Sequence, residues 1–169
     1  MENSEVGWLA GIIDGEGCLC LRILLRKTRA HGVRPRFQPQ LTVVNTDEEI
    51  IRRASRVLAS LGVKHRVFER NKKHGKKQFC IDVYSSGLRL LLPQISGLLC
   101  KNREAEILMR ALQMGEENRT AKHAGSWGSQ PIPNERLVEY DSLRSQLVGL
   151  HGRQAKSLIK HSAVTFKAD

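Results

Sequence analysis

One nine-residue segment constrains the fold of this chain more than any other, and it reads Leu9-Ala10-Gly11-Ile12-Ile13-Asp14-Gly15-Glu16-Gly17. Apolar residues spaced three and four apart predict a helix that begins near Asn3 or Ser4 and ends at the last glycines of the segment. Gly11 and Gly15 lie four positions apart, so they share one helix face and allow the backbone of another helix to approach closely. The segment therefore predicts a helix that packs through small residues.

The same segment places two carboxylates, Asp14 and Glu16, at the C-terminal end of the predicted helix. The helix macrodipole is already negative there, so each carboxylate costs a few tenths to about 1 kcal/mol unless a cation or a donor compensates. Oxygen ligands at such an end suit a hard divalent ion such as Mg²⁺. The spacing is equally compatible with a helix that stops in a glycine turn, in which Asp14 caps nearby amides.

The charge of the chain is concentrated rather than spread. There are 28 Lys and Arg against 17 Asp and Glu, a net charge of +11. Residues 22–36 contain six basic side chains and no acid, and residues 64–77 contain seven basic side chains and one acid. A merely solvated surface mixes its signs along the chain. Two basic blocks indicate a face that binds a polyanion such as nucleic acid.

The length of 169 residues and a hydrophobic content of 40% predict a single globular domain over residues 1–169. No apolar run approaches the roughly 18 residues that a membrane span needs, and no signal-peptide pattern opens the sequence. We therefore expect no membrane contact and a cytoplasmic or organellar location. The four cysteines include no CxxC pair, which favours reduced thiols over a metal site or a disulfide framework.

Strand and helix patterns alternate along the rest of the chain. Pro39 interrupts the apolar series of one strand and predicts either an unpaired side or a bulge. Thr46 and Glu49 have the spacing of a capping box at a helix start. The expected elements are strands at 18–26 and 34–44 joined by a basic loop at 27–33, a helix at 46–61, a hairpin of strands at 63–70 and 78–84, helices at 88–95, 102–115 and from 134, and a loop at 116–133.

The order helix-strand-strand-helix-strand-strand-helix predicts an α+β fold. Four strands with one apolar and one polar face form an antiparallel sheet with helices on one side only. The core of this fold spans residues 4–115, and C-terminal helices and a tail occupy residues 116–169. The exposed sheet face is wide and basic, which suits a groove of duplex DNA.

With this order of elements, the segment at 9–17 resembles the motif of the LAGLIDADG homing endonucleases nearly position for position. The resemblance extends over residues 4–115 and implies the saddle-like αββαββα sheet of that family. It implies that motif helices pack together at a two-fold axis, and a chain with one motif is then expected to form a homodimer. The residues expected at this interface are Trp8, Gly11, Ile12 and Gly15.

The resemblance also implies a catalytic set. Glu16 occupies the acidic position of the motif and is expected to bind the catalytic metal together with the carbonyl group of Gly15. The expected metal is Mg²⁺, with Mn²⁺ as another divalent ion of the same kind. Asn45 best fits the polar residue at the end of the second strand, and Thr46 is the competing position, although we expect it to cap the next helix. Lys101 matches a lysine that precedes the helix after the fourth strand.

The exposed face of the sheet is where we expect contacts to DNA. Arginine and glutamine can make bidentate contacts to guanine or adenine, whereas lysines in loops bind phosphate. For any single arginine, a phosphate contact is an equal alternative to base readout. The expected DNA-contacting residues are Arg22, Arg26, Lys27, Arg29, Arg34, Arg36, Gln38, Gln40, Thr42, Lys64, Arg66, Arg70, Lys72, Lys73, Lys76, Lys77, Gln78, Cys80 and Asp82.

Together these observations predict a metal-dependent, site-specific endonuclease that hydrolyses phosphodiester bonds in both strands of DNA. We expect it to be encoded within an intron and to act as a homodimer on a long pseudo-palindromic target, with no small-molecule substrate. The alternative that the sequence leaves open is an RNA maturase or a non-catalytic nucleic-acid-binding protein on the same scaffold.

Overall fold

The computed structural model of the chain describes residues 3–28, 32–71, 75–122 and 132–152. It confirms the α+β class and the αββαββα order, which two further α-helices extend. The elements are α1 (Asn3–Glu16), β1 (Gly17–Thr28), β2 (Gly32–Asn45), α2 (Glu48–Ser60), β3 (Arg66–Arg70), β4 (Gln78–Tyr84), α3 (Ser85–Ile95), the 3-10 helix η1 (Ser96–Leu98), α4 (Asn102–Lys122) and α5 (Asn134–Leu150).

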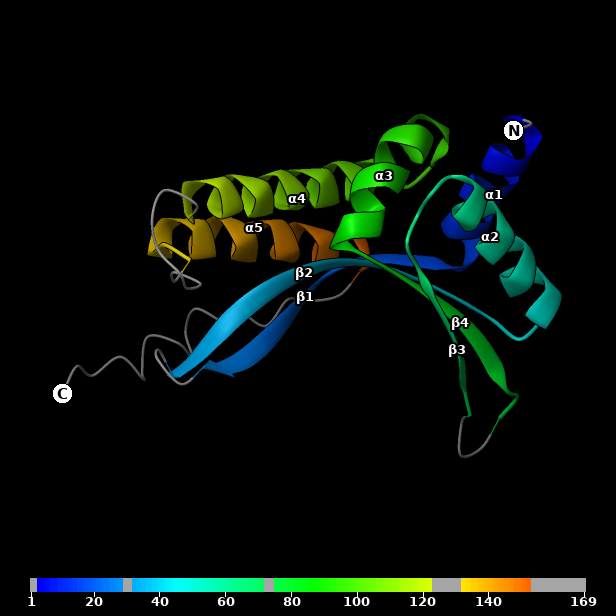
Figure 1. Cartoon of the computed structure of the whole chain (residues 1–169), viewed down its shortest axis with the longest axis horizontal. Coiled ribbons are helices and arrows are strands. Elements are labelled where there is room, and N and C mark those ends of the chain that lie inside the picture. Colours follow the sequence, from blue (N-terminus) through cyan, green and yellow to red (C-terminus); the bar gives the residue numbers. More distant parts are fainter. Residues whose placement is uncertain (1–2, 29–31, 72–74, 123–131, 153–169) are drawn as a thin grey trace.

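The four strands form one antiparallel sheet in the order β1-β2-β4-β3. Figure 1 shows the helices on one side of the sheet only, while the two hairpins descend as arms on either side of a concave surface. The short central pairing of β2 with β4, from Gln40 to Asn45, joins the two arms. The predicted four-stranded sheet with helices on one face is confirmed.

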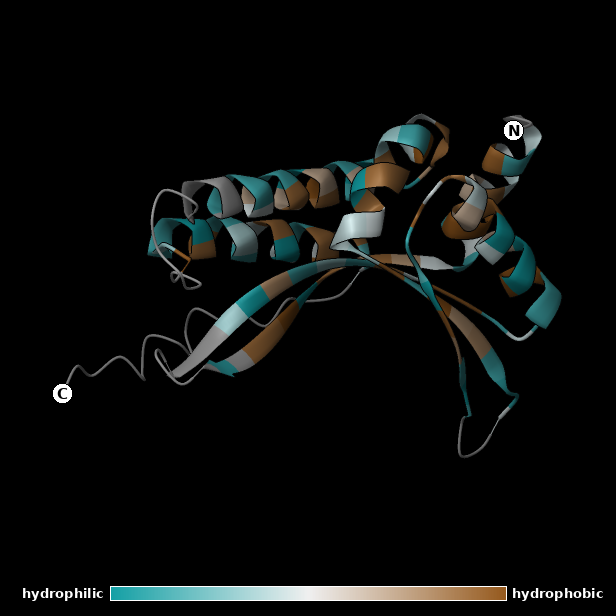
Figure 2. Cartoon of the chain, in the orientation of Figure 1, coloured by the Kyte–Doolittle hydropathy of each residue, from teal (hydrophilic) through white to brown (hydrophobic). Residues whose placement is uncertain are grey.

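The register assigns alternate residues to the two faces of the sheet. Leu41 pairs with Leu19 of β1 and Val83 of β4, and all three side chains are buried against the helices. One position along, Gln40 pairs with Cys20 and Tyr84 in a row on the opposite, concave face. Hydrophobic and hydrophilic positions accordingly alternate along the strands in Figure 2, as a period of two residues requires.

The helices cover the apolar face through residues at helical spacing. In α2, Ile51, Ala54, Val57 and Leu58 are buried, as the sequence pattern predicted. The chain leaves α2 through Gly62, whose φ of +70° is a conformation that glycine adopts without strain. Among the described residues, none of the helices combines the length and apolar character that a membrane crossing needs.

The first hairpin differs from the expectation because both of its strands are longer. The pairing of β1 with β2 runs without a bulge to Thr28 and Gly32, so Lys27 and Val33 lie in strands and not in a basic loop. Pro39 pairs with Leu21 of β1 and directly precedes Gln40, the first residue of β2 that pairs with β4, so its other side faces no strand. The unpaired side predicted at this proline is confirmed, and the bulge was the wrong alternative.

The start of α2 also differs. The N-cap is Asp47, whose side chain accepts a hydrogen bond from the Glu49 amide at 2.9 Å, so the capping role assigned to Thr46 was wrong. The predicted strand at 63–70 begins only at Arg66, because residues 61–65 make the turn that follows α2. Lys64 therefore precedes β3 and does not lie on the hairpin face.

The predicted end of a helix at Gly115 was wrong, since α4 continues to Lys122 and includes the first part of the expected loop. A Cβ on Gly115 would lie 3.6 Å from the Tyr140 hydroxyl, so the glycine lies where α5 packs closely. Ion pairs tie the extended part of α4 to α5, including Arg136 to Glu117 at 2.7 Å. Packing against α5 therefore outweighs the weak helix propensity of glycine.

Candidate functional site

The C-terminal end of α1 is joined to the start of α4 by Asp14. Its two carboxylate oxygens accept hydrogen bonds from the backbone N–H groups of Cys100 and Lys101, at 2.8 and 3.0 Å. The Ala105 amide donates to the Lys101 carbonyl at 3.1 Å, so the Asp14 charge lies at the positive end of the α4 dipole. Asp14 thus has a structural role, as in the capping alternative, but its amides lie far away in sequence.

The same turn brings the Lys101 side chain back to the motif. Lys101 Nζ donates to the carbonyl oxygens of Ile13 and Gly17, at 3.1 and 2.7 Å. No basic residue lies in the last turn of α1, so this ammonium supplies the positive charge that the negative helix end needs. Two of its three N–H donors are used, which leaves one for a water or a phosphate oxygen. The turn before α4 therefore brings the Lys101 ammonium to the C-terminal end of the motif helix.

Glu16 is exposed at this end of α1, beside the exposed Gly15. Both Asp14 oxygens are occupied by amides, so Glu16 is the carboxylate of the motif that remains available to a metal. Within the described residues, no group of three or more His, Cys, Asp or Glu side chains can hold a metal ion. One carboxylate and one backbone carbonyl per chain suit a hard divalent ion only as half of a ligand set.

Asn45 lies at the end of β2, where it pairs with Phe79 of β4. Its side-chain oxygen accepts a hydrogen bond from the Asp47 amide at 2.8 Å, which shapes the turn into α2. By alternation along the strand, Asn45 falls on the face opposite Thr42. Asn45 is half-buried and shares its face of β2 with Leu41 and Val43.

One face of α1 is open. Gly7, Gly11 and Gly15 repeat every four residues, all three are exposed, and a Cβ on any of them would meet nothing within 4 Å. Trp8 and Ile12 beside this row are half-buried. Nothing within the described part of this chain therefore explains why these three positions lack a side chain.

A charged group from α2 borders the glycine row. The Arg53 guanidinium carbon lies 4.2 Å from the centroid of the Trp8 ring, and Arg53 Nη2 donates to a Glu5 carboxylate oxygen at 2.8 Å. The Arg53 hydrogen bond holds the pKa of Glu5 below its ordinary value. The Trp8 ring is thereby held against its own chain on one side.

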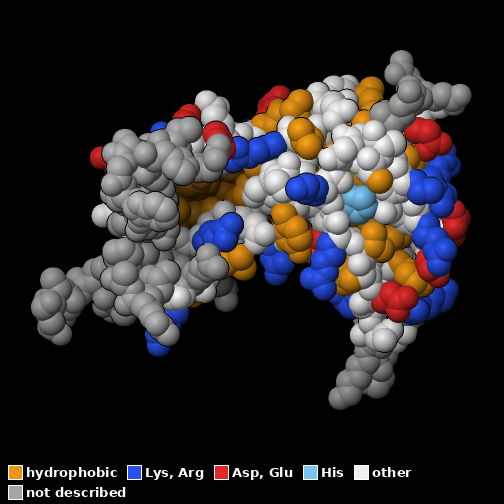
Figure 3. Space-filling view, in the orientation of Figure 1, with side chains coloured by type: hydrophobic (Ala, Val, Ile, Leu, Met, Phe, Trp, Pro, Cys, Tyr) orange, Lys and Arg blue, Asp and Glu red, His pale blue; other side chains and the backbone are white. Residues whose placement is uncertain are grey.

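The concave face of the sheet gathers most of the expected DNA-contacting strand residues. In the second hairpin Arg66 pairs with Asp82 and Arg70 with Gln78, so these side chains share the face with Cys80. In the first hairpin Arg22 pairs with Gln38, and Arg36 falls on the same face. The backbone of Arg26 pairs with that of Arg34 in the same register. Figure 3 shows the molecule hollowed between the arms, with Lys and Arg side chains around the hollow.

Several expected contact residues are placed differently or lie outside the described residues. Lys27 falls on the opposite face from Arg22, because the two residues are an odd number of positions apart along β1 and side chains alternate between the faces. Lys77 pairs with Glu69 at 2.8 Å, close to the hairpin tip. Lys76 precedes β4 and is exposed. The residues outside the described ranges are Arg29, Lys72 and Lys73.

A feature that sequence reasoning missed is a hydrogen-bonded chain across the middle of the concave face. It links Arg22 to Gln40, Gln40 to Thr42 and Thr42 to Asp82, at 3.1, 2.9 and 2.6 Å. The Tyr84 hydroxyl also donates to Asp82, at 3.0 Å, and desolvation together with this bond raises the pKa of Tyr84. Gln40 and Asp82 are only 2% and 7% exposed, so they are less accessible to DNA than we expected.

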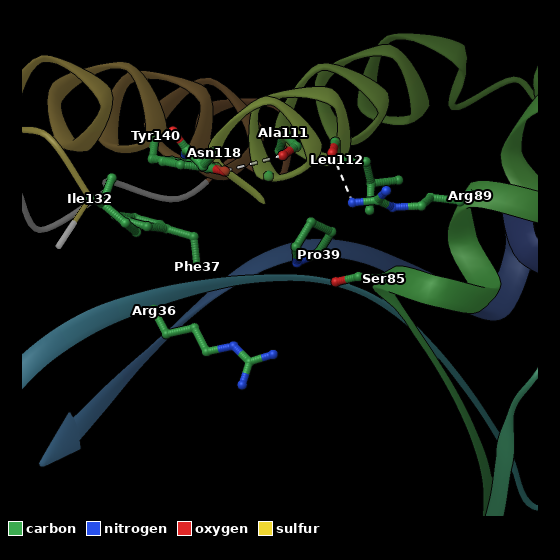
Figure 4. Close-up of a pocket in the computed structure, with 11 residues that line it drawn as sticks. Arg36, Phe37, Pro39, Ser85, Arg89, Ala111, Leu112, Asn118, Ile132 and Tyr140 are labelled. Carbon is green, nitrogen blue, oxygen red and sulfur yellow. Dashed lines mark hydrogen bonds between the residues drawn. The ribbon is translucent and has the colours of Figure 1, made fainter. Parts of the chain in front are cut away.

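A cavity of about 340 Å³ lies on the other side of β2, beneath α4 and α5. Phe37 stacks on Tyr140 there with ring centroids 4.5 Å apart, while Arg36 points away from the helices, to the concave side of β2 (Figure 4). Arg89 crosses one end and donates to the Leu112 carbonyl at 3.2 Å. The cavity belongs to the contact between the first arm and the added helices.

Comparison with solved structures finds the same architecture in DNA-bound proteins. The archaeal intron-encoded homing endonuclease I-Vdi141I, in complex with DNA, matches with a TM-score of 0.70 and 15% identity over 97% of this chain and 96% of that one. I-CvuI with its target and 2 mM Ca matches at 0.60 and 19%, over 95% and 92%. The LAGLIDADG meganuclease I-AabMI, bound to uncleaved DNA, matches at 0.60 and 18%, over 95% of this chain and 49% of that one.

Neither a family model nor a curated protein matches the sequence. All three identities are below 25%, so the likeness is one of fold.

Proposed function

From the LAGLIDADG fold of this chain, we propose that it is a site-specific DNA endonuclease that acts as a homodimer and cleaves both strands of a long, near-palindromic target. One observation carries the proposal. An available carboxylate, Glu16, and an ammonium group, Lys101, both lie at the end of α1, where strand β1 of the sheet begins. A carboxylate beside a lysine on a DNA-binding surface is the chemistry of phosphodiester hydrolysis.

The concave face is the DNA-binding surface of this proposal. Its width between the two arms and its row of Arg and Gln side chains suit the major groove of duplex DNA. The proposed phosphate contacts are lysines near the tip of the second hairpin, Lys76 and Lys77. Exposed basic residues contribute affinity that weakens steeply as salt rises.

The open face of α1 supports the proposed homodimer. Gly7, Gly11 and Gly15 are exposed and leave space for another backbone, which the same face of a second copy fills across a two-fold axis. Closure brings the two Glu16 carboxylates toward one another and doubles the ligand set. One chain alone would cleave at most one strand.

Mg²⁺ or Mn²⁺ is the proposed cofactor, held by Glu16 and the Gly15 carbonyl of both copies. When bound, such an ion polarises a phosphate oxygen and makes water a stronger nucleophile. The chain itself contributes Lys101, whose remaining N–H donor is available to the phosphate oxygen on which charge develops. Asn45 is the third proposed catalytic residue, and its amide NH₂ group can position a water molecule at the site, because its oxygen already accepts from the Asp47 amide.

The experiment is cleavage of a duplex that carries the uninterrupted host gene, with Mg²⁺ present. We expect one double-strand cut by the wild-type chain, and binding without cutting by Glu16→Gln. Binding to the interrupting RNA, without any DNA cleavage, would instead assign the chain as a maturase. Full cleavage by Glu16→Gln would contradict the proposed mechanism.

A further inference from the structure

The hydrogen-bonded chain on the concave face has a fixed direction. Asp82 is a carboxylate and can only accept, so the Thr42 hydroxyl must donate its single proton to it, at 2.6 Å. Thr42 then accepts from the Gln40 amide nitrogen, at 2.9 Å. The oxygen of the Gln40 amide is therefore turned toward Arg22, where it accepts from Nη1 at 3.1 Å.

This direction decides what Gln40 can do. The side chain is 2% exposed, and both ends of its amide already have partners within the sheet. Reading a base would require Gln40 to break these bonds and leave Thr42 and Arg22 without them. Gln40 is therefore a positioning residue, and the exposed group that it positions is the Arg22 guanidinium.

We propose that Arg22 reads a guanine in the major groove, and that Asp82 holds it in the reading position through Thr42 and Gln40. This inference rests on the proposed DNA-binding function. Arginine recognises guanine by donating two N–H groups to O6 and N7, and only a guanidinium of fixed orientation can do so reliably. With one Nη1 bond held by Gln40, the Nε and Nη2 groups of Arg22 are left to donate.

The position of Arg22 favours a base over a phosphate. It lies in the middle of β1, opposite Gln38, on the concave face and away from the hairpin tip. The Asp82 carboxylate lies in the same hydrogen-bonded chain, and its negative charge repels the full charge of a phosphate more strongly than the partial charges on guanine O6 and N7. In a homodimer, the prediction is a guanine at the same distance on each side of the target centre.

The test is a binding selection from randomised duplex DNA, carried out with Ca²⁺ in place of Mg²⁺. The wild-type chain should enrich a symmetric pair of guanines. Arg22→Ala should reduce the preference for guanine at that position by about 5-fold to 100-fold, and leave the other selected positions unchanged. Arg22→Lys keeps the charge without the planar fork, so it should lose the preference while retaining most of the affinity.

Gln40→Leu has a similar volume and keeps Arg22, so a reduced guanine preference in this variant isolates the positioning role. If it fails to fold, Asp82→Asn serves the same purpose, because an amide can donate and so removes the fixed direction. Arg36→Ala is the matched control, since Arg36 is an exposed arginine on the same face of the neighbouring strand. It should leave the Arg22 position unaltered.

Three outcomes are distinguishable. The inference would be supported if Arg22→Ala and Arg22→Lys lost the preference for guanine at the two symmetric positions and Gln40→Leu weakened it. Selected sites that keep every base preference in Arg22→Ala would show a phosphate contact and overturn the inference while the proposed function stands. Enrichment of no duplex sequence by the wild-type chain would overturn both.

Discussion

Lys101 Nζ lies 2.7 Å from the carbonyl oxygen of Gly17, although 84 positions separate the two residues in the sequence. The lysine reaches this oxygen because its own backbone amide is held by Asp14 at 3.0 Å. Hydrogen bonds thus join the end of α1 and the first residue of β1 to the start of α4. Groups that serve the proposed chemistry are positioned by groups that hold the fold together.

Lys101→Met removes the ammonium but keeps most of the apolar stem. Since Lys101 is the proposed electrostatic donor, we expect the single-turnover cleavage rate to fall by about 100-fold or more. DNA affinity should change little, because one charge among many is lost. A gel-shift titration beside the cleavage assay separates the two effects, and an equal fall in both would assign Lys101 to binding only.

Asp14→Asn should destabilise the chain. The new NH₂ group faces a backbone donor, so the Cys100 or the Lys101 amide loses its acceptor, at a cost of about 1 kcal/mol in the free energy of unfolding. Urea denaturation measures this difference. Glu16→Gln is the matched control, because Glu16 is exposed and should stay within about 0.5 kcal/mol of wild type. Equal stability of both variants would refute the structural role of Asp14.

Gly11→Leu tests the proposed dimer. Its Cβ meets nothing within 4 Å in one chain, so each chain should still fold. A leucine at this position would keep two α1 helices apart, so we expect sedimentation of a single 19.0 kDa chain where the wild type sediments as a pair. Leu90→Gln is a control at an exposed position of α3, outside the glycine row of α1, and should remain dimeric. Dimers of Gly11→Leu would exclude this face as the interface.

Glu139 predicts a pH dependence of stability. Its hydrogen bond from Arg110, at 2.7 Å, is the main cause that holds the pKa of this carboxyl below its ordinary value of 4.5. Between the folded pKa of Glu139 and pH 4.5, the unfolded chain binds more protons than the folded one, so the free energy of unfolding rises with pH. The stabilisation from the contact of Glu139 with Arg110 is complete above about pH 4.5 and is lost as the pH falls through the folded pKa of Glu139.

The measurement is urea unfolding of wild type and Glu139→Gln at pH 7 and pH 3. At pH 7 the wild type should have the larger free energy of unfolding. The difference in this free energy between wild type and Glu139→Gln should be smaller at pH 3. Arg110→Met removes the partner of Glu139, so the difference in free energy of unfolding between wild type and this variant should also be smaller at pH 3 than at pH 7. If the difference in free energy of unfolding were the same at both pH values, the pKa of Glu139 would not differ between the folded and the unfolded chain.

The fold was predictable because its signals are local. Alternation around Leu41 and the helical spacing of Ile51, Val57 and Leu58 each follow from neighbouring residues, and the structure confirms both. The errors arose at boundaries, where local signals compete. Thr46 and Asp47 are both good N-cap residues, and the one that caps α2 is decided by the turn after β2.

The sequence by itself determined the periodicity of the elements, the two basic blocks and the acidic motif, since each depends on residues close together in the chain. Only the tertiary structure decided which groups meet. It separated Asp14, whose oxygens are taken by distant amides, from the exposed Glu16, and it turned Gln40 from an apparent base reader into a support for Arg22. The physical reason is that a polar side chain's role depends on which of its donors and acceptors are already satisfied, and packing alone settles that.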